Sequence, residues 1–109
     1  MEVRSIVKFV RISPKKAIYM ARELRDKKAL DVVNMLRVTS GKAAYLIRKA
    51  IFSAIANAEN NFNLDKNMLS VKSVTIGCAP TMKRHITKAR GMSGRIRKRM
   101  SHLNVILSN

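Results

Sequence analysis

Residues 81–102 are the part of the chain whose side chains are most clearly suited to chemistry. The stretch TMKRHITKARGMSGRIRKRMSH contains eight lysines or arginines and both histidines of the chain, and it has no acidic residue. Ammonium and guanidinium groups form charge-assisted hydrogen bonds with phosphate oxygens, and arginine can do so with two parallel bonds. The chemistry indicated is therefore the binding of a phosphate-rich polyanion. A solvated, disordered basic block is the plain alternative.

The charge of the whole chain favours the same kind of partner. The sequence has 23 basic and 6 acidic side chains, a net charge of +17, and no acidic residue after Asp65. Such a charge repels itself unless a polyanion neutralises it, so nucleic acid is the expected partner. A membrane is the competing polyanion, but no apolar run approaches the roughly 18 to 20 residues that span a bilayer. The charged N-terminal residues also argue against a secretory signal.

No set of residues indicates an enzyme. The six carboxylates form no paired motif, and Ser101 and His102 are neighbours on opposite faces of an expected strand, so they cannot act as a dyad. His85 and His102 lack further metal ligands, and the single cysteine, Cys78, has no C-x-x-C partner. We therefore expect no catalytic residue, no metal and no cofactor, with Cys78 a small buried side chain in a reducing compartment.

Two apolar segments must position the basic stretch. Residues 68–78 and 103–107 have the pattern of strands, and Gly91 and Gly94 lie near the middle of the segment between them. This arrangement predicts a long β-hairpin that turns near residue 90, with Ile76 opposite about Val105. Each arm beyond the core would have about ten residues and reach about 30 Å, at ~3.3 Å per residue. Its side chains would have no protein core around them, so another molecule must cover them.

The parity of the returning strand predicts which face of the hairpin binds phosphate. Arg95, Arg97 and Arg99 alternate in phase with Leu103, Val105 and Leu107. One face is thus expected to change from cationic at the far end to apolar at the base. No aromatic residue follows Phe62, which argues against a platform that stacks single-stranded RNA bases.

The rest of the chain predicts one domain with the order strand, three helices, strand, strand. Residues 3–12 alternate as a strand, and helices are expected from Ser13-Pro14 to about Leu24, over 29–39 and over about 41–61, with Ser13 and Ser40 as N-caps. A slip of phase near Lys72 indicates a bulge or an irregular strand start. Ile18 and four aromatic residues are expected in the core: Phe9, Tyr19, Tyr45 and Phe52. The longest helix carries an apolar stripe that implies close packing: Ala43, Ala44, Ile47, Ala50, Ile51, Ala54, Ile55 and Ala58.

Four segments together resemble one known family. SPKKA at 13–17, KAAYLIRKAIFSAIANAENN at 42–61, and then MKRHITKARG and IRKRMSHLNVIL closely resemble the bacterial-type large-ribosomal-subunit protein L22 family, in the same order and over essentially the whole chain. Two positions depart from the family pattern: Thr87-Lys88 stands where a proline and an arginine are usual, and Met92 where a basic residue is common. A lysine cannot reproduce the planar fork of arginine, so these changes bear on individual contacts at the tip.

The resemblance implies an α+β fold in which three helices pack on a small antiparallel sheet with a long protruding β-hairpin. It implies a single RNA-binding domain over 1–109, with a globular body formed by 1–78 and 103–109 and an extended arm at about 79–102. It further implies a structural protein of the ribosome that binds large-subunit ribosomal RNA, assists assembly and lines the nascent-peptide exit tunnel with residues 88–92. The expected location is the bacterial cytoplasm, and an organelle-encoded origin stays open as the alternative. Expected partners are this RNA, neighbouring ribosomal proteins and the nascent polypeptide, without membrane or homo-oligomer.

The residues expected to bind ribosomal RNA come from the N-terminal region and from the arm. They are Lys8, Arg11, Lys15, Lys16, Lys83, Arg84, His85, Lys88, Arg90, Arg95, Arg97, Lys98 and Arg99, and the expected tunnel-lining tip is Lys88, Ala89, Arg90, Gly91 and Met92. On pattern alone, a solvent-exposed role is as well supported for the four N-terminal cations. An architectural DNA-binding protein with a basic β-ribbon is the alternative function, although such proteins usually dimerise.

Overall fold

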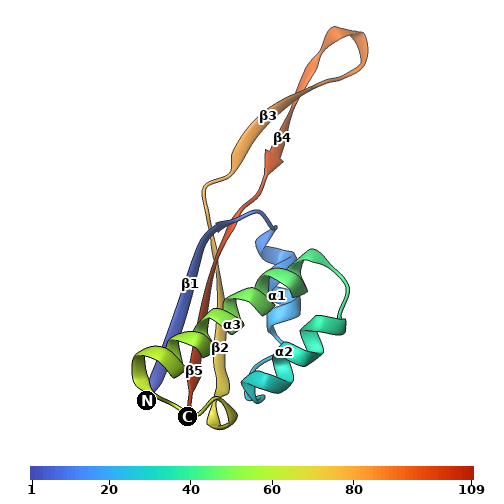
Figure 1. Ribbon diagram of the computed structural model, residues 1–109. Coiled ribbons are helices and arrows are strands. Elements are labelled where there is room, and N and C mark those ends of the chain that lie inside the picture. The colour runs from blue at the N-terminus through green and yellow to red at the C-terminus, as the bar shows by residue number, and fades with distance from the viewer.

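The computed structural model describes residues 1–109 and contains three α-helices and five β-strands (Figure 1). The strands are β1 (Glu2–Val10), β2 (Ser70–Cys78), β3 (Met82–Thr87), β4 (Ser93–Lys98) and β5 (Ser101–Ser108), and the helices are α1 (Pro14–Ala21), α2 (Ala29–Val38) and α3 (Lys42–Phe62). There are also two short 3-10 helices: η1 (Lys66–Met68) precedes β2, and η2 (Ala89–Gly91) forms the far end of the hairpin. The predicted order of elements is confirmed.

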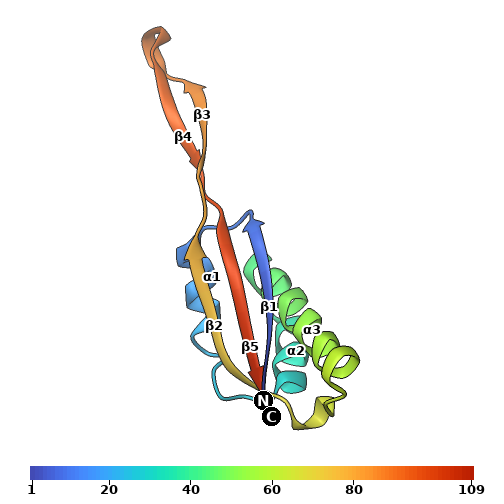
Figure 2. The same ribbon diagram turned by 90° about the vertical axis from the view of Figure 1, so that its left-hand side faces the viewer.

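The strands form two separate antiparallel sheets. β1, β5 and β2 make a three-stranded sheet in that order, while β3 and β4 pair only with each other. The helices lie on one face of the three-stranded sheet, and Figure 2 shows the other face toward the viewer without a helix over it. The two-stranded sheet protrudes beyond this layered part, and the molecule measures 62 × 25 × 18 Å. The α+β fold with a protruding hairpin is therefore confirmed.

The core lies between α3 and the three-stranded sheet, with α1 and α2 completing it. The stripe predicted on α3 is buried, apart from Ala43 at its start, which is only partly covered. Leu103, Val105 and Leu107 of β5 are fully buried beneath it. None of the 22 buried residues of the core falls between residues 72 and 102. The layered part of the molecule is thus packed without any contribution from the hairpin arm.

The expectation that four aromatic residues lie in the core is wrong. Phe9 is 56% exposed, Tyr19 71%, Tyr45 48% and Phe52 62%. The core contacts of α3 are instead made largely by alanines, whose small side chains let the helix backbone approach the sheet and leave no room for rings. Two of the exposed rings lie beside cations: Tyr19 beside Arg22 at 5.9 Å, and Tyr45 beside Arg48 and Lys49 at 5.4 and 5.1 Å.

Helix boundaries differ from the prediction at three places. The Ser13 side chain makes no capping hydrogen bond, although Pro14 does begin α1. The N-cap of α3 is Gly41 rather than Ser40, and its φ of +114° is one that glycine adopts easily. α1 ends at Ala21 instead of near Leu24. Ile18, expected in the core, is 38% exposed at its edge. Cys78, expected to be buried, is exposed at the end of β2.

Bulges change the alternation of both outer strands. The register of β2 against β5 shifts between Val71 and Ser73, which confirms the irregularity predicted near Lys72. In β1 the shift lies between Val7 and Val10, where Phe9 has a φ of +58°. Val10 therefore becomes buried and the ring of Phe9 turns outward, although the simple alternation placed Phe9 inside.

Side-chain hydrogen bonds hold the start of β5 against the end of β1 and the residues that follow it. The Phe9 N–H donates to Nδ1 of His102 at 3.1 Å, and the two rings meet edge to face with their centroids 5.0 Å apart. Next to it, the buried hydroxyl of Ser101 donates to the Ile12 carbonyl at 2.8 Å. Ser101 and His102 therefore serve to hold β5 against the end of β1, and they point to different partners, as their strand parity predicts.

Candidate nucleic-acid interface

The protruding arm is a regular antiparallel ribbon. Residues 82–87 pair with 98–93 without interruption, so that Lys83 is opposite Arg97 and His85 is opposite Arg95. At the tip, Arg90 and Gly91 have φ values of +62° and +72°, and the Lys88 N–H donates to the Met92 carbonyl at 2.6 Å. The reversal predicted near residue 90 is therefore confirmed.

Gly94, the second glycine of the arm, does not lie at the turn as Gly91 does. Gly94 lies in β4, and the methylenes of Lys88 cross the space that a side chain at position 94 would occupy. Lys88, one of the expected tip residues, thus folds back over the ribbon instead of extending beyond it. All five expected tip residues, 88–92, are exposed.

The register at the base of the arm differs from the predicted one. Ile76 is opposite Leu103 and not Val105. The two ladders are separated by a neck with three residues, 79–81, on one side and two, Arg99 and Met100, on the other. If the pairing of the arm continued unbroken into the layered part, Ile76 would be opposite Asn104. The neck has one residue more on the side of β2 and β3, so Ile76 is opposite Leu103 instead. The arm and the layered part are therefore separate sheets, and the single continuous face expected from Arg95 to Leu107 is not formed.

The pairing assigns the side chains of the arm to two faces, because residues directly opposite each other point to the same side. One side, which we call the cationic face, holds Lys83, His85, Arg95 and Arg97. The strand parity predicted Arg95 and Arg97 together, and the register adds the other two from β3. The opposite face combines two cations, Arg84 and Lys98, with three apolar side chains: Met82, Ile86 and Ile96.

The cations of the arm have no anionic partner within the protein. The only ion pair in the structure joins Lys72 to Glu2, which lie on the three-stranded sheet. Arg84 donates to the carbonyl of its neighbour Lys83 at 2.8 Å and otherwise lies near the sulfur of Met82. Exposed cations on a hydrogen-bonded ribbon are therefore free to form hydrogen bonds with an external anion.

The four N-terminal cations expected to bind RNA are exposed but lie in different places. Lys8 is on the face of β1 that is not covered by helices, and Lys15 and Lys16 are in the first turn of α1. Arg11 is the one that the fold brings to the arm, because it lines a shallow hollow there. We call this the arm-base hollow; its lining is Arg11, Ser13, Lys42, Arg97, Lys98 and Arg99.

Lys42 was not among the residues expected from the sequence. It is the first residue of α3 and is far in sequence from every other residue of the hollow. Its only signal in the sequence is its position directly after the helix-starting glycine. The tertiary fold alone brings it beside the arm.

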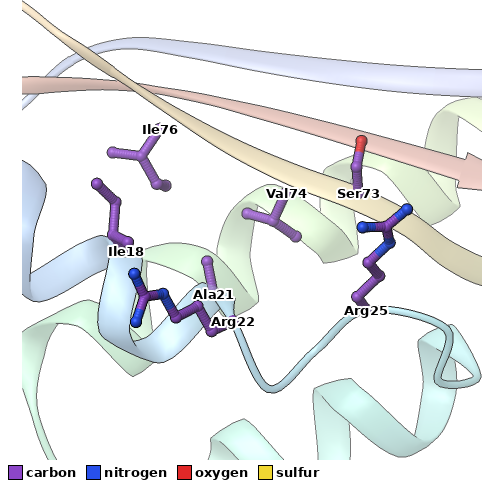
Figure 3. Close-up of a pocket in the computed structure, with 7 residues that line it drawn as sticks. All are labelled: Ile18, Ala21, Arg22, Arg25, Ser73, Val74 and Ile76. Carbon is purple, nitrogen blue, oxygen red and sulfur yellow. The ribbon is translucent and has the colours of Figure 1, made fainter.

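A second groove with basic character lies between α1 and β2 (Figure 3). Its floor is apolar, with Ile18, Ala21, Val74 and Ile76, and Ser73 also lines it. Figure 3 shows the guanidinium groups of Arg22 and Arg25 on either side of Ala21 and Val74. No carboxylate lines this groove, so it is also a surface that favours anions.

Neither a metal site nor a membrane-spanning helix is found in the structure. No group of three or more histidine, cysteine or acidic side chains is arranged to hold a metal ion. None of the three helices combines the length and the apolar character that a membrane span requires. The features of this surface that point to a partner are its exposed cations.

Comparisons with known proteins point to one family. A family model described as ribosomal protein L22p/L17e matches residues 5–108. The chain is 44% identical over 109 residues to the large ribosomal subunit protein uL22 of Akkermansia muciniphila, covering 100% of this chain and 97% of that protein. It is 50% identical over 107 residues to uL22 of Methylacidiphilum infernorum (98% and 94% covered) and 41% identical over 109 residues to uL22 of Fusobacterium nucleatum (100% and 98% covered).

Proposed function

Because the chain belongs to the ribosomal protein L22p/L17e family, we propose that it binds large-subunit ribosomal RNA along its hairpin arm and lines the peptide exit tunnel with the tip of that arm. Membership itself makes the chain a structural protein of the large ribosomal subunit, with ribosomal RNA and ribosomal proteins as its partners, and not an enzyme. It also places the chain in the ribosome, and hence in the cytoplasm, in place of the DNA-binding alternative.

The observation that best supports the RNA-binding proposal is that the cations of the arm have no anionic partner within the protein. A ribbon has fixed spacing, so Lys83, Arg95 and Arg97 on the cationic face can each meet a different phosphate. The remaining proposed contacts come from His85 on the same cationic face, from the opposite face, the tip and the neck of the arm, and from the N-terminal region. They are Arg84, His85, Lys88, Arg90, Lys98 and Arg99 of the arm, and Lys8, Arg11, Lys15 and Lys16 of the globular body.

We expect the double variant Arg95→Gln/Arg97→Gln to bind large-subunit RNA about tenfold more weakly at moderate salt, because it loses two phosphate contacts. The slope of log K against log salt should fall by about 1.5, since each contact contributes roughly 0.7 to 0.9. Filter binding with protein-free large-subunit RNA over a salt series measures the affinity and this slope. Lys28→Gln/Lys66→Gln is the matched control, because it removes the same charge from the end of the body opposite the arm. Equal affinity and slope in both variants would contradict the proposal.

The proposal for the tunnel rests on the shape of the molecule and on the family. The exposed tip, residues 88–92, is at the far end of a 62 Å long molecule and contributes no residue to the buried core. Such a tip can reach through RNA to a surface that the body cannot approach. We propose that the arm thereby joins RNA segments early in assembly, with one copy of the protein per subunit, and passes close to the nascent polypeptide.

A photoreactive amino acid in place of Met92 tests this placement directly. In ribosomes stalled with a labelled nascent chain, we expect crosslinks from position 92 to the nascent chain, because Met92 is 69% exposed at the tip. The same amino acid at Ser53, on the outer side of α3, is the control and should give none. Crosslinks from position 53 alone, or from neither position in ribosomes that contain the protein, would refute the tunnel placement.

A further inference from the structure

The arm-base hollow concentrates positive charge where the arm joins the body. Five cations line it together with Ser13, and neither an acidic nor an apolar side chain contributes to its wall. They come from three separate places: Arg11 after β1, Lys42 at the start of α3, and residues 97–99 at the end of β4. Five like charges in one hollow repel each other, so their convergence favours an anion between them.

The neck beside this hollow holds the arm only weakly. The ladders of the two sheets stop at Cys78 and Met82 on one side and at Lys98 and Ser101 on the other. Between them a single backbone hydrogen bond, from the Ala79 N–H to the Met100 carbonyl at 3.1 Å, crosses the neck. Pro80 has no N–H to add to it. The direction of the arm therefore depends on whatever else bridges arm and body.

The hollow is continuous with the cationic face of the arm. Arg97 belongs to both, so a strand that follows Arg95 and Arg97 along the arm is led to Arg99 and then to the body residues Arg11 and Lys42. A phosphodiester chain carries one charge per nucleotide, and five cations exceed what one phosphate needs. The hollow thus fits consecutive phosphates of a nucleic-acid backbone better than a single small anion.

We propose that the arm-base hollow binds a run of two or more consecutive phosphates of RNA backbone, and that this contact fixes the direction in which the arm leaves the body. The inference rests on the proposed RNA-binding function and adds Lys42 to its residues. The N–H groups in the first turn of α3, which begins at Lys42, have no partner within the helix and add to the attraction for phosphate. RNA is then the element that links arm and body across the neck.

The first test measures binding. Arg11→Gln/Lys42→Gln changes two body residues of the hollow and leaves the arm intact. With protein-free large-subunit RNA as the probe, we expect affinity to fall about tenfold and the salt slope by about 1.5 relative to the control Lys28→Gln/Lys66→Gln. Circular dichroism should show that both variants stay folded, since all four side chains are exposed.

The second test measures the direction of the arm. Cys78 is replaced with serine, and spin labels are attached to new cysteines at positions 53 and 89, in place of Ser53 and Ala89. The distance between the two labels is measured by pulsed electron paramagnetic resonance. Addition of the RNA should narrow the distance distribution, because the contact holds arm to body. Arg11→Gln/Lys42→Gln in the same labelled protein should leave the distribution broad at saturating RNA.

The outcomes separate the two proposals. If Arg11→Gln/Lys42→Gln matches the control while Arg95→Gln/Arg97→Gln is weakened, the hollow is not an RNA site and the proposed function stands. If both variants match the control, the proposed function itself fails. If RNA binding is unchanged but the hollow variant no longer enters assembling subunits, an acidic protein segment is the occupant and the inference is overturned.

Discussion

Replacing Leu103 with alanine is expected to lower the free energy of unfolding by about 2 to 5 kcal/mol, the range for large-to-small changes in a core. Leu103 is fully buried in the central strand β5, between Val7 of β1 and Ile76 of β2. Strands on both sides and α3 above prevent the site from collapsing around the smaller side chain. Urea unfolding of the RNA-free protein, followed by circular dichroism, measures the change.

Ile86→Ala is the matched control for this experiment. Ile86 is also an aliphatic side chain on a strand, but it lies on the arm and is 46% exposed. Its replacement should change the free energy of unfolding by no more than about 0.5 kcal/mol. Equal losses for the two variants would mean that arm and body unfold as one cooperative unit. That would contradict the prediction that the body is stabilised without the arm.

Replacing residues 82–98 with an Asn-Gly turn is expected to leave the body folded and to remove most of its salt-sensitive RNA binding. The deletion takes away seven cations and no core residue. A protein with six to ten phosphate contacts loses about 10³ to 10⁵ in affinity between 50 and 200 mM salt. The shortened protein should lose less than about 10² over that range in filter binding, with an unfolding transition close to that of the full chain.

A second variant separates the charge of the arm from its shape. In it the ribbon is kept and its seven lysines and arginines are changed to glutamine: Lys83, Arg84, Lys88, Arg90, Arg95, Arg97 and Lys98. It should bind RNA as weakly as the shortened protein. Affinity and salt slope equal to those of the unchanged chain would contradict an electrostatic role for the arm.

The order of elements and the existence of the hairpin could be predicted because each depends on local patterns. The α3 stripe repeats with the period of a helix, and the alternation after residue 102 is that of a strand with one buried face. The glycine at the turn and the phase slip near Lys72 are equally local. These signals were enough to predict the two arms of the ribbon and the side of β5 that packs on α3.

What could not be predicted depends on how elements meet. The outward position of Phe52 and Tyr45 follows from the close approach of the α3 backbone to the sheet, which residue type alone does not reveal. The pairing of Ile76 with Leu103 depends on three neck residues facing two, and no periodicity encodes that difference. Lys42 joins the arm-base hollow only because the start of α3 is packed beside the neck.

None of the 22 buried core residues lies between residues 72 and 102, and this separates two kinds of natural selection on the chain. A substitution in the core reduces the amount of folded protein and exposes the remainder to proteases, so the cell loses the component itself. A substitution in the arm removes no buried core residue, so the protein stays folded and the change acts where the arm meets RNA. Variation in the arm is therefore tested during subunit assembly and translation and not during protein quality control, and folded protein with an altered arm can persist at full abundance.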